Sequence, residues 1–176
     1  MWKINVKTIV AIGIGAALFF VLGRFVAIPS PVPNVTICIQ YGLLAFMAAL
    51  FGPIAGFLIG LIGHFLIDLS WGWGVWWSWV IASACFGFVV GLLGNRTRLA
   101  FGQFGKKGAI NFNLAQAIAH AGAWIVIAPI LDILIYQEPA NKVFIQGGVS
   151  ALSNIITTAI ITVSVETDIR RLGEVS

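Results

Sequence analysis

Long apolar runs, broken only by short polar segments, constrain this chain more than any other feature of its sequence. Hydrophobic residues make up 60% of it and charged residues only 9%, whereas soluble domains carry about 25% charged residues. Such a chain cannot cover a soluble surface with polar groups, so we expect the lipid bilayer to be its solvent. A spanning helix needs roughly 20 apolar residues. The 176 residues therefore allow about six spans with short loops and no separate soluble domain.

The apolar runs divide into six segments, which predicts an all-α integral membrane protein with six transmembrane helices in a single membrane domain. Proline- and glycine-rich breaks or a basic stretch separate the segments. The second segment is short for a bilayer, so we expect it to be tilted differently or to lie among its neighbours. The expected spans cover residues of about 8–27, 35–51, 53–70, 75–94, 110–135 and 143–165 of the chain 1–176.

The positions of lysine and arginine predict that both termini are cytoplasmic (N-in, C-in). Cytoplasmic loops carry an excess of these residues, and an inside N-terminus places eight of them inside and two outside. The net charge of +4 therefore reflects topology, and we expect no nucleic-acid partner. The inside set is Lys3, Lys7, Arg96, Arg98, Lys106, Lys107, Arg170 and Arg171, and the outside set is Arg24 and Lys142.

Ionisable residues within the spans are few, and most of them map to the outer third of the membrane. A charge in hydrocarbon costs at least ~2.5 kcal/mol, so such residues usually face a cavity or the bundle interior. His64 lies one helical turn from Asp68 on the same face. Arg24 could pair with Asp68 or Asp132, or it could extend to the headgroups. For His120, nearer the membrane centre, we expect an interhelical hydrogen bond.

The segment "WGWGVWWSW" at 71–79 holds five of the seven tryptophans. An interfacial belt explains some of them. It does not explain all, because Trp76, Trp77 and Trp79 enter a helix on different faces, so some must point inward. Indole has apolar faces and a hydrogen-bonding N–H, which makes it a suitable wall for a flat heteroaromatic ligand. We therefore expect these three residues to stack on a ligand.

Neutral polar residues on the sixth span face the same side of the membrane. Gln146, Ser150 and Asn154 recur every fourth residue, and Asn141 lies just before them. With the indoles they predict an amide- and aromatic-lined pocket for a small, mostly uncharged ring. We expect hydrogen bonds from Asn141, Gln146 and Asn154, and polar orientation or gating by Arg24, His64 and Asp68.

Motifs for catalysis or energy conversion are missing from the sequence. "FGQFGKK" approaches a phosphate-binding loop but departs from its pattern, so we expect no ATP hydrolysis by this chain and no catalytic residues. No tight metal-ligand spacing occurs, and we expect neither a metal nor another cofactor. Cys38 and Cys85 fall inside predicted helices and are expected to be buried thiols. A proton-coupled carrier that uses His64 and Asp68 remains the alternative from another class.

Small residues recur at every fourth position in several spans. Such rows allow close helix packing in lipid, and they serve either internal packing or, on the first span, docking to another membrane protein. The rows are Gly52, Gly56 and Gly60; Gly87 and Gly91; and, on the first span, Ala11 with Gly15 or Gly13 with Ala17.

Four stretches together resemble the substrate-binding (S) component of energy-coupling factor (ECF) transporters, in particular the riboflavin and hydroxymethylpyrimidine/pyridoxine kinds. The GRF, FGP–G–GH–D and LDILIY–EPANK–F–QG combinations carry the likeness. The stretches are "KTIVAIGIGAALFFVLGRFVAIP" (7–29), "FGPIAGFLIGLIGHFLID" (51–68), "WWSWVIASACFGFVVGLLG" (76–94) and "APILDILIYQEPANKVFIQGGVSALSN" (128–154).

The resemblance implies a plasma-membrane protein of a prokaryote that binds a vitamin from outside. Partners would be a membrane scaffold, the T component, and two ABC-type ATPases that use ATP. The first span would dock on the scaffold through Ala11 and Gly15 or the overlapping Gly13 and Ala17. The loop 29–34, with Asn34, would close the ligand site. We expect hydroxymethylpyrimidine or a pyridoxine-type vitamer as ligand, with riboflavin or another vitamin as the alternative.

Overall fold

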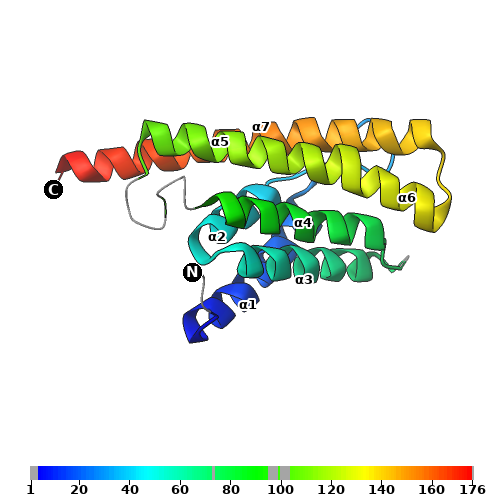
Figure 1. Cartoon of the computed structure of the whole chain (residues 1–176), viewed down its shortest axis with the longest axis horizontal. Helices are drawn as coiled ribbons and strands as arrows, with labels where there is room; N and C mark the ends of the chain where they lie inside the picture. The colour runs from blue at the N-terminus through cyan, green and yellow to red at the C-terminus, as the bar shows by residue number, and fades with distance from the viewer. Residues whose placement is uncertain (1–3, 73, 95–98, 100–103, 176) are drawn as a thin grey trace.

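A computed structural model of the chain describes residues 4–72, 74–94, 99 and 104–175, with the side chains of the last helix described up to residue 168. The described residues form six helical segments that run along the long axis of the molecule (Figure 1). The predicted all-helical architecture with six helices is confirmed. The segments are α1 (Val6–Val21) continued by the π-helical η1 (Leu22–Val26), α2 (Gln40–Phe51), α3 (Pro53–Trp71), α4 (Trp77–Leu93), α5 (Lys106–Ala121) continued through η4 (Gly122–Ile127) into α6 (Ala128–Tyr136), and α7 (Ala140–Val175).

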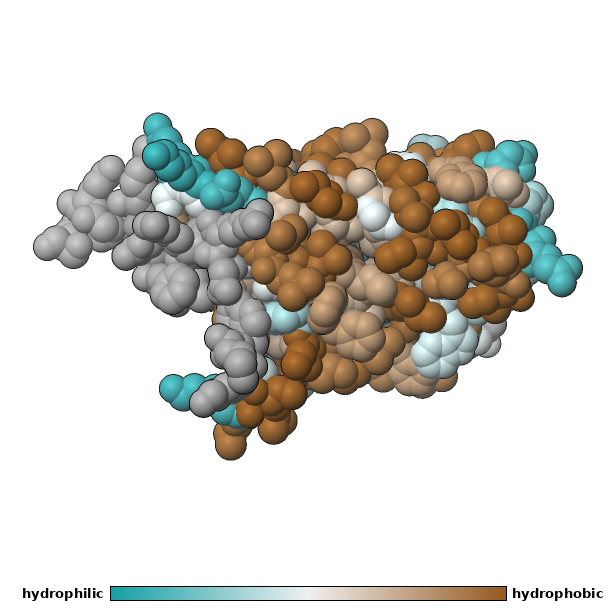
Figure 2. Space-filling view, in the orientation of Figure 1, coloured by the Kyte–Doolittle hydropathy of each residue, from teal (hydrophilic) through white to brown (hydrophobic). Residues whose placement is uncertain are grey.

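The helices form two layers, with α5, α6 and α7 in one and α1 to α4 in the other (Figure 1). On the face shown in Figure 2, brown apolar residues cover the middle, and teal hydrophilic residues lie toward both ends. Among the described residues, four helical stretches are long and apolar enough to cross a membrane, while α2 and α4 are shorter. The beginning of α1 and the end of α7 lie at the same end of the molecule, as an even number of spans requires. Lys3, Arg96 and Arg98, on which the predicted orientation partly rests, lie outside the described residues.

The second helix begins at Gln40, later than the residue 35 expected from its apolar run. The preceding residues form a short hairpin, in which β1 (Ile28–Pro29) pairs antiparallel with β2 (Thr36–Ile37). Three prolines in "IPSPVPN" remove backbone donors and disfavour helix in the residues before them. Asn34 turns the chain with a φ of 63°, in the left-handed region that asparagine tolerates well.

The glycine rows of α3 and α4 serve internal packing, as one of the two interpretations predicted. A Cβ on Gly60 would lie 2.5 Å from the carbonyl oxygen of Ser83, and one on Gly91 would lie 2.5 Å from Cα of Pro53. The two backbones are thus in direct contact, which only small residues permit.

The small residues of α1 face two ways. Ala11 and Gly15 are buried, and a Cβ on Gly15 would lie 2.7 Å from Cδ1 of Ile59. Their assignment to an exposed docking row is therefore wrong, because this row packs against α3. Gly13 and Ala17 are exposed, and a Cβ on Gly13 would meet nothing within 4 Å. Of the two overlapping rows, only this one lies on the surface.

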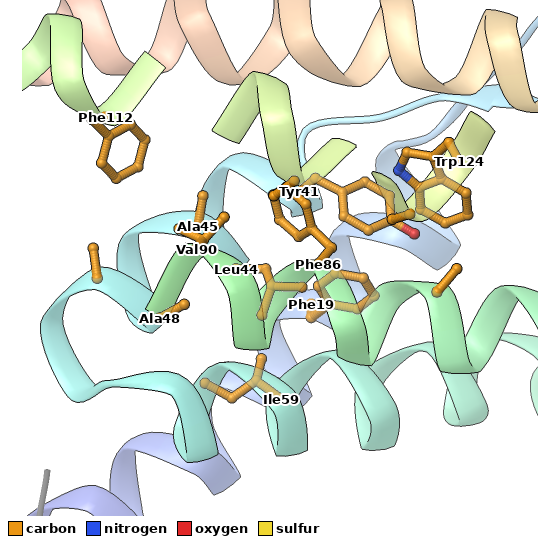
Figure 3. Close-up of a cluster of buried hydrophobic side chains, with 14 of the residues drawn as sticks. Phe19, Tyr41, Leu44, Ala45, Ala48, Ile59, Phe86, Val90, Phe112 and Trp124 are labelled. Atoms are coloured by element: carbon orange, nitrogen blue, oxygen red, sulfur yellow. The ribbon is translucent and has the colours of Figure 1, made fainter. Parts of the chain in front are cut away.

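The core between the two layers centres on the ring of Tyr41 (Figure 3). Its centroid lies 5.3 Å from that of Phe19, 5.7 Å from Phe86 and 5.3 Å from Trp124, each with edge-to-face geometry. These contacts join α1, α2, α4 and η4, and aromatic pairs in this geometry contribute beyond the area they bury. Tyr41 and Trp124 also form the floor of the cavity described next.

Candidate functional site

A cavity of about 530 Å³ lies between the two layers, near the α3–α4 and α6–α7 connections. Its volume is within the ~300–1,000 Å³ typical of small-molecule sites. The hairpin residues, the end of α3, the start of α4, η4, α6 and the start of α7 all contribute to its wall. Mostly aromatic and apolar groups line it, with a few polar side chains that could fix the orientation of a ligand.

Indole and phenol rings form one wall of the cavity. Trp76, Trp79 and Trp124 line it, and Trp79 and Trp124 have centroids 5.1 Å apart. Trp76 stacks on Tyr136 with centroids 4.1 Å apart and 19° between the planes. The wall is thus braced from behind by further aromatic contacts.

Asp132 holds this wall in place. Its side chain is 1% exposed and accepts a hydrogen bond from Nε1 of Trp76 at 2.6 Å, another from Nε1 of Trp79 at 2.9 Å, and a third from the Ser78 hydroxyl. An ionised carboxylate only accepts hydrogen bonds, so three neutral donors suit it. Because both indole N–H groups are engaged with Asp132, the ring faces of Trp76 and Trp79 are what remains for a ligand.

Asp68 and His64 form a second polar group of the cavity. Asp68 Oδ2 accepts the backbone N–H of Trp76 at 2.9 Å, while its Oδ1 lies 3.6 Å from His64 Nε2. His64 Nδ1 lies 2.5 Å from the Ser83 hydroxyl, which also bonds the hydroxyl of Tyr41 at 2.9 Å. Ser83 is fully buried, so this serine–histidine–aspartate order offers no nucleophile to a substrate. Among the described residues, no three His, Cys, Asp or Glu side chains are grouped to hold a metal ion.

The polar stripe of α7 forms the opposite side and ties down the hairpin. Gln146 donates to the carbonyl oxygen of Pro33 at 2.9 Å. One turn and two turns further, Ser150 and Asn154 line the cavity as well, and Asn154 lies 3.8 Å from the thiol of Cys38. The stripe therefore both faces the cavity and holds the segment that covers it.

Most of the side chains singled out from the sequence meet at this cavity. Three do not line it. The ring of Trp77 packs toward Phe65 with centroids 5.8 Å apart, and Asn141 is exposed. The guanidinium of Arg24 lies over the ring of Trp71 at 3.9 Å and not against either aspartate. The predicted residues that line the cavity are Asn34, His64, Asp68, Trp76, Trp79, Gln146 and Asn154.

The cavity holds more charged side chains than the expected amide- and aromatic-lined pocket. Asp68, Asp132 and Glu138 line it together with one lysine, Lys142. Glu138 and Lys142 pair with each other at 2.6 Å. The two aspartates instead bind neutral donors of the protein, so their charge fixes the wall.

Several cavity residues were missed in the sequence, among them Tyr41, Trp124 and Gln40. Trp124 lies in the middle of a long apolar run, away from the interfaces where tryptophan concentrates, and that unusual position was a usable signal. Gln40 lies at the start of α2, where the expected boundary placed it inside a span. Its place at the cavity depends on the hairpin that precedes α2, and the apolar pattern did not predict this hairpin.

A family model described as "ECF-type riboflavin transporter, S component" matches residues 3–171. A UPF0397 protein of Exiguobacterium sp. is 56% identical over 161 residues, covering 92% of this chain and 88% of the relative. A UPF0397 protein of Staphylococcus aureus (strain Newman) is 51% identical over 158 residues, covering 90% and 86%.

Among solved structures, the S component for biotin from an ECF-type ABC transporter superposes with a TM-score of 0.61 and covers 96% of this chain and 92% of its own. Its sequence identity is 20%, so this likeness speaks for the fold alone. The family match extends over nearly the whole sequence, and the chain therefore belongs to the family of ECF-type riboflavin transporter S components.

Proposed function

We propose that the cavity captures a flat heteroaromatic vitamin from outside the cell, with riboflavin as the first candidate. The chain is a multi-pass membrane component of an ECF-type transporter, and this family is not one of enzymes. The observation that carries the proposal is the 530 Å³ cavity, walled by aromatic faces on one side and by a polar stripe on the other.

The two unlike sides of the cavity suit a ligand with a planar ring and a polar chain. The faces of Trp76, Trp79 and Trp124 provide area for stacking. Across from them, Ser150 and Asn154 offer hydroxyl and amide groups. Riboflavin combines a tricyclic ring with a polyhydroxylated chain. The family description also favours riboflavin over hydroxymethylpyrimidine or pyridoxine, which the sequence alone had ranked first.

Energy for uptake would come from partner subunits. The sequence contains no phosphate-binding loop, so ATP would be used by two ABC-type ATPases that join through a T component. This chain would need no cofactor of its own. The exposed row of Gly13 and Ala17 on α1 is the surface that we assign to docking on the T component.

Mass spectrometry of small molecules that co-purify with the detergent-solubilised chain tests the proposal. We expect riboflavin, released on denaturation, from the wild type and at least about tenfold less from Trp76→Ala. Trp77→Ala is the matched control, since the neighbouring indole does not line the cavity. Equal recovery from both variants would refute the assignment of the cavity.

The rival function is a proton-coupled carrier that uses His64 and Asp68. Nε2 of His64 and Oδ1 of Asp68 lie 3.6 Å apart. Riboflavin uptake by the chain alone in proteoliposomes, driven by a pH gradient, would favour it. Uptake that needs the T component and ATPases would favour the proposal.

A further inference from the structure

The side-chain oxygen of Gln40 is a buried acceptor that no other described residue satisfies, on a residue of the cavity wall. Gln40 lies in the first turn of α2, is 5% exposed and lines the cavity. Within the described part of the chain, its Oε1 has no hydrogen-bond partner. Buried acceptors of this kind are rare in native proteins, and each one calls for a partner from outside the chain or for a specific role.

Among the described residues that carry such an atom, Gln40 differs from the others in its position. Five buried side-chain atoms of the described residues lack a partner, on Gln40, Gln116, His120, Thr158 and Glu166. Of these residues only Gln40 contributes to the cavity wall. Gln40 is therefore the one residue of these five that combines an unpartnered buried oxygen with a place in the cavity wall.

The two aspartates of the cavity already accept hydrogen bonds from the protein. Asp132 accepts from two indoles and a hydroxyl, and Asp68 accepts the backbone N–H of Trp76. The chain also leaves space for the Gln40 amide, because a Cβ on Gly23 would lie 2.8 Å from Nε2 of Gln40. A side chain at Gly23 would displace the amide from its place.

We propose that Gln40 determines ligand specificity by accepting, through Oε1, a hydrogen bond from an N–H on the edge of the ligand ring. This inference rests on the proposed function and deepens it. It selects heterocycles with a ring imide, a ring lactam or an amino group on that edge. It disfavours rings that present only acceptors or alkyl groups there, because the buried oxygen would remain unpaired. The isoalloxazine ring of riboflavin carries one imide N–H, at N3.

The experiment measures the equilibrium binding of riboflavin and of N3-methylriboflavin. Quenching of flavin fluorescence reports the binding of each ligand. In the wild type, the methyl derivative should bind about tenfold to a hundredfold more weakly. In Gln40→Leu, riboflavin should lose affinity by a similar factor, and the two ligands should then bind almost equally. This second comparison separates loss of the hydrogen bond from steric exclusion of the methyl group.

Gln116→Leu is the matched control, because Gln116 is also a buried glutamine with an unpartnered Oε1 but does not line the cavity. This variant should retain the wild-type preference for riboflavin over its methyl derivative. If Gln40→Leu fails to fold, equal binding of the two ligands to the wild-type protein still refutes the inference.

The possible outcomes distinguish a failure of this inference from a failure of the proposed function. If riboflavin binds and the N3-methyl derivative binds equally well to the wild type, the role of Gln40 is refuted while the proposed function stands. The same follows if Gln40→Leu keeps a wild-type preference. If the wild type binds no riboflavin at all, the proposed function fails and this inference fails with it.

Discussion

Asp132 organises the binding wall without offering its own charge to a ligand. The carboxylate is buried and takes hydrogen bonds from three donors that come from one turn of α4 and the residue before it. Hydrogen bonds to an ionised acceptor are roughly twice as strong as neutral ones, and low polarity strengthens them further. One side chain of α6 thus sets the orientation of two cavity-lining indoles.

Asp132→Asn should weaken riboflavin binding at least about tenfold, because the amide NH₂ would face an indole N–H and leave one donor unpaired. Tryptophan emission should shift at the same time, since Trp76 and Trp79 lose a fixed partner. Asp168→Asn, at an exposed position of α7, is the control. Unchanged affinity and emission in Asp132→Asn would contradict the assigned role.

Thr158 gives a second prediction, for stability. The residue is fully buried and its hydroxyl has no partner among the described residues. Thr158→Val should therefore leave the free energy of unfolding unchanged or raise it by up to about 1 kcal/mol. Thr162→Val should lower it, because the Thr162 hydroxyl donates to the Thr158 carbonyl at 2.8 Å. Denaturation in detergent measures both, and equal losses would show that Thr158 has a partner.

At the scale of elements, the helix pairs were more predictable than the segment that covers the cavity. Glycine spacing on α3 and α4 indicated close packing because the cause, a missing side chain at every fourth residue, is local. The hairpin over Ile28–Ile37 was not predicted, since an apolar β-branched run is compatible with strand or helix. The contact of its Pro33 with Gln146 joins residues 113 positions apart in the sequence.

Gly60→Ala should lower the free energy of unfolding by roughly 1–3 kcal/mol, as expected for overpacking, because its Cβ would press on the backbone of Ser83. Gly148→Ala on α7 should be neutral or stabilising by up to ~1 kcal/mol, since nothing lies within 4 Å of its Cβ. Thermal unfolding of the two variants compares them directly. Similar behaviour of both would contradict the contact between α3 and α4.

The two faces of α1 should separate docking from folding. The double variant Gly13→Leu/Ala17→Leu should bind riboflavin and unfold like the wild type, yet lose co-purification with the T component, because it alters only exposed positions. Ala11→Leu should instead destabilise the chain by roughly 1–3 kcal/mol, since Ala11 is 7% exposed. Retained assembly of the double variant would exclude this docking row.

For the whole molecule, composition determined the environment and the number of helices, but not the chemistry of the cavity. The expected amide- and aromatic-lined pocket followed from the polar stripe on one helix and the nearby indoles. The carboxylate that holds those indoles, Asp132, is 53 and 56 positions away from them in the sequence. Similarly, Trp76 and Trp77 are equivalent in sequence. Only packing against α6 turns the first toward the cavity and leaves the second against Phe65.

The most direct test is a titration of the purified wild-type chain and of the Trp79→Ala variant with riboflavin. Quenching of flavin fluorescence reports binding in both proteins. An aromatic-walled cavity predicts saturable binding of one riboflavin per chain, weakened at least about tenfold in the variant. A signal that does not saturate, or that is identical in the two proteins, would contradict the capture of a planar vitamin between these rings.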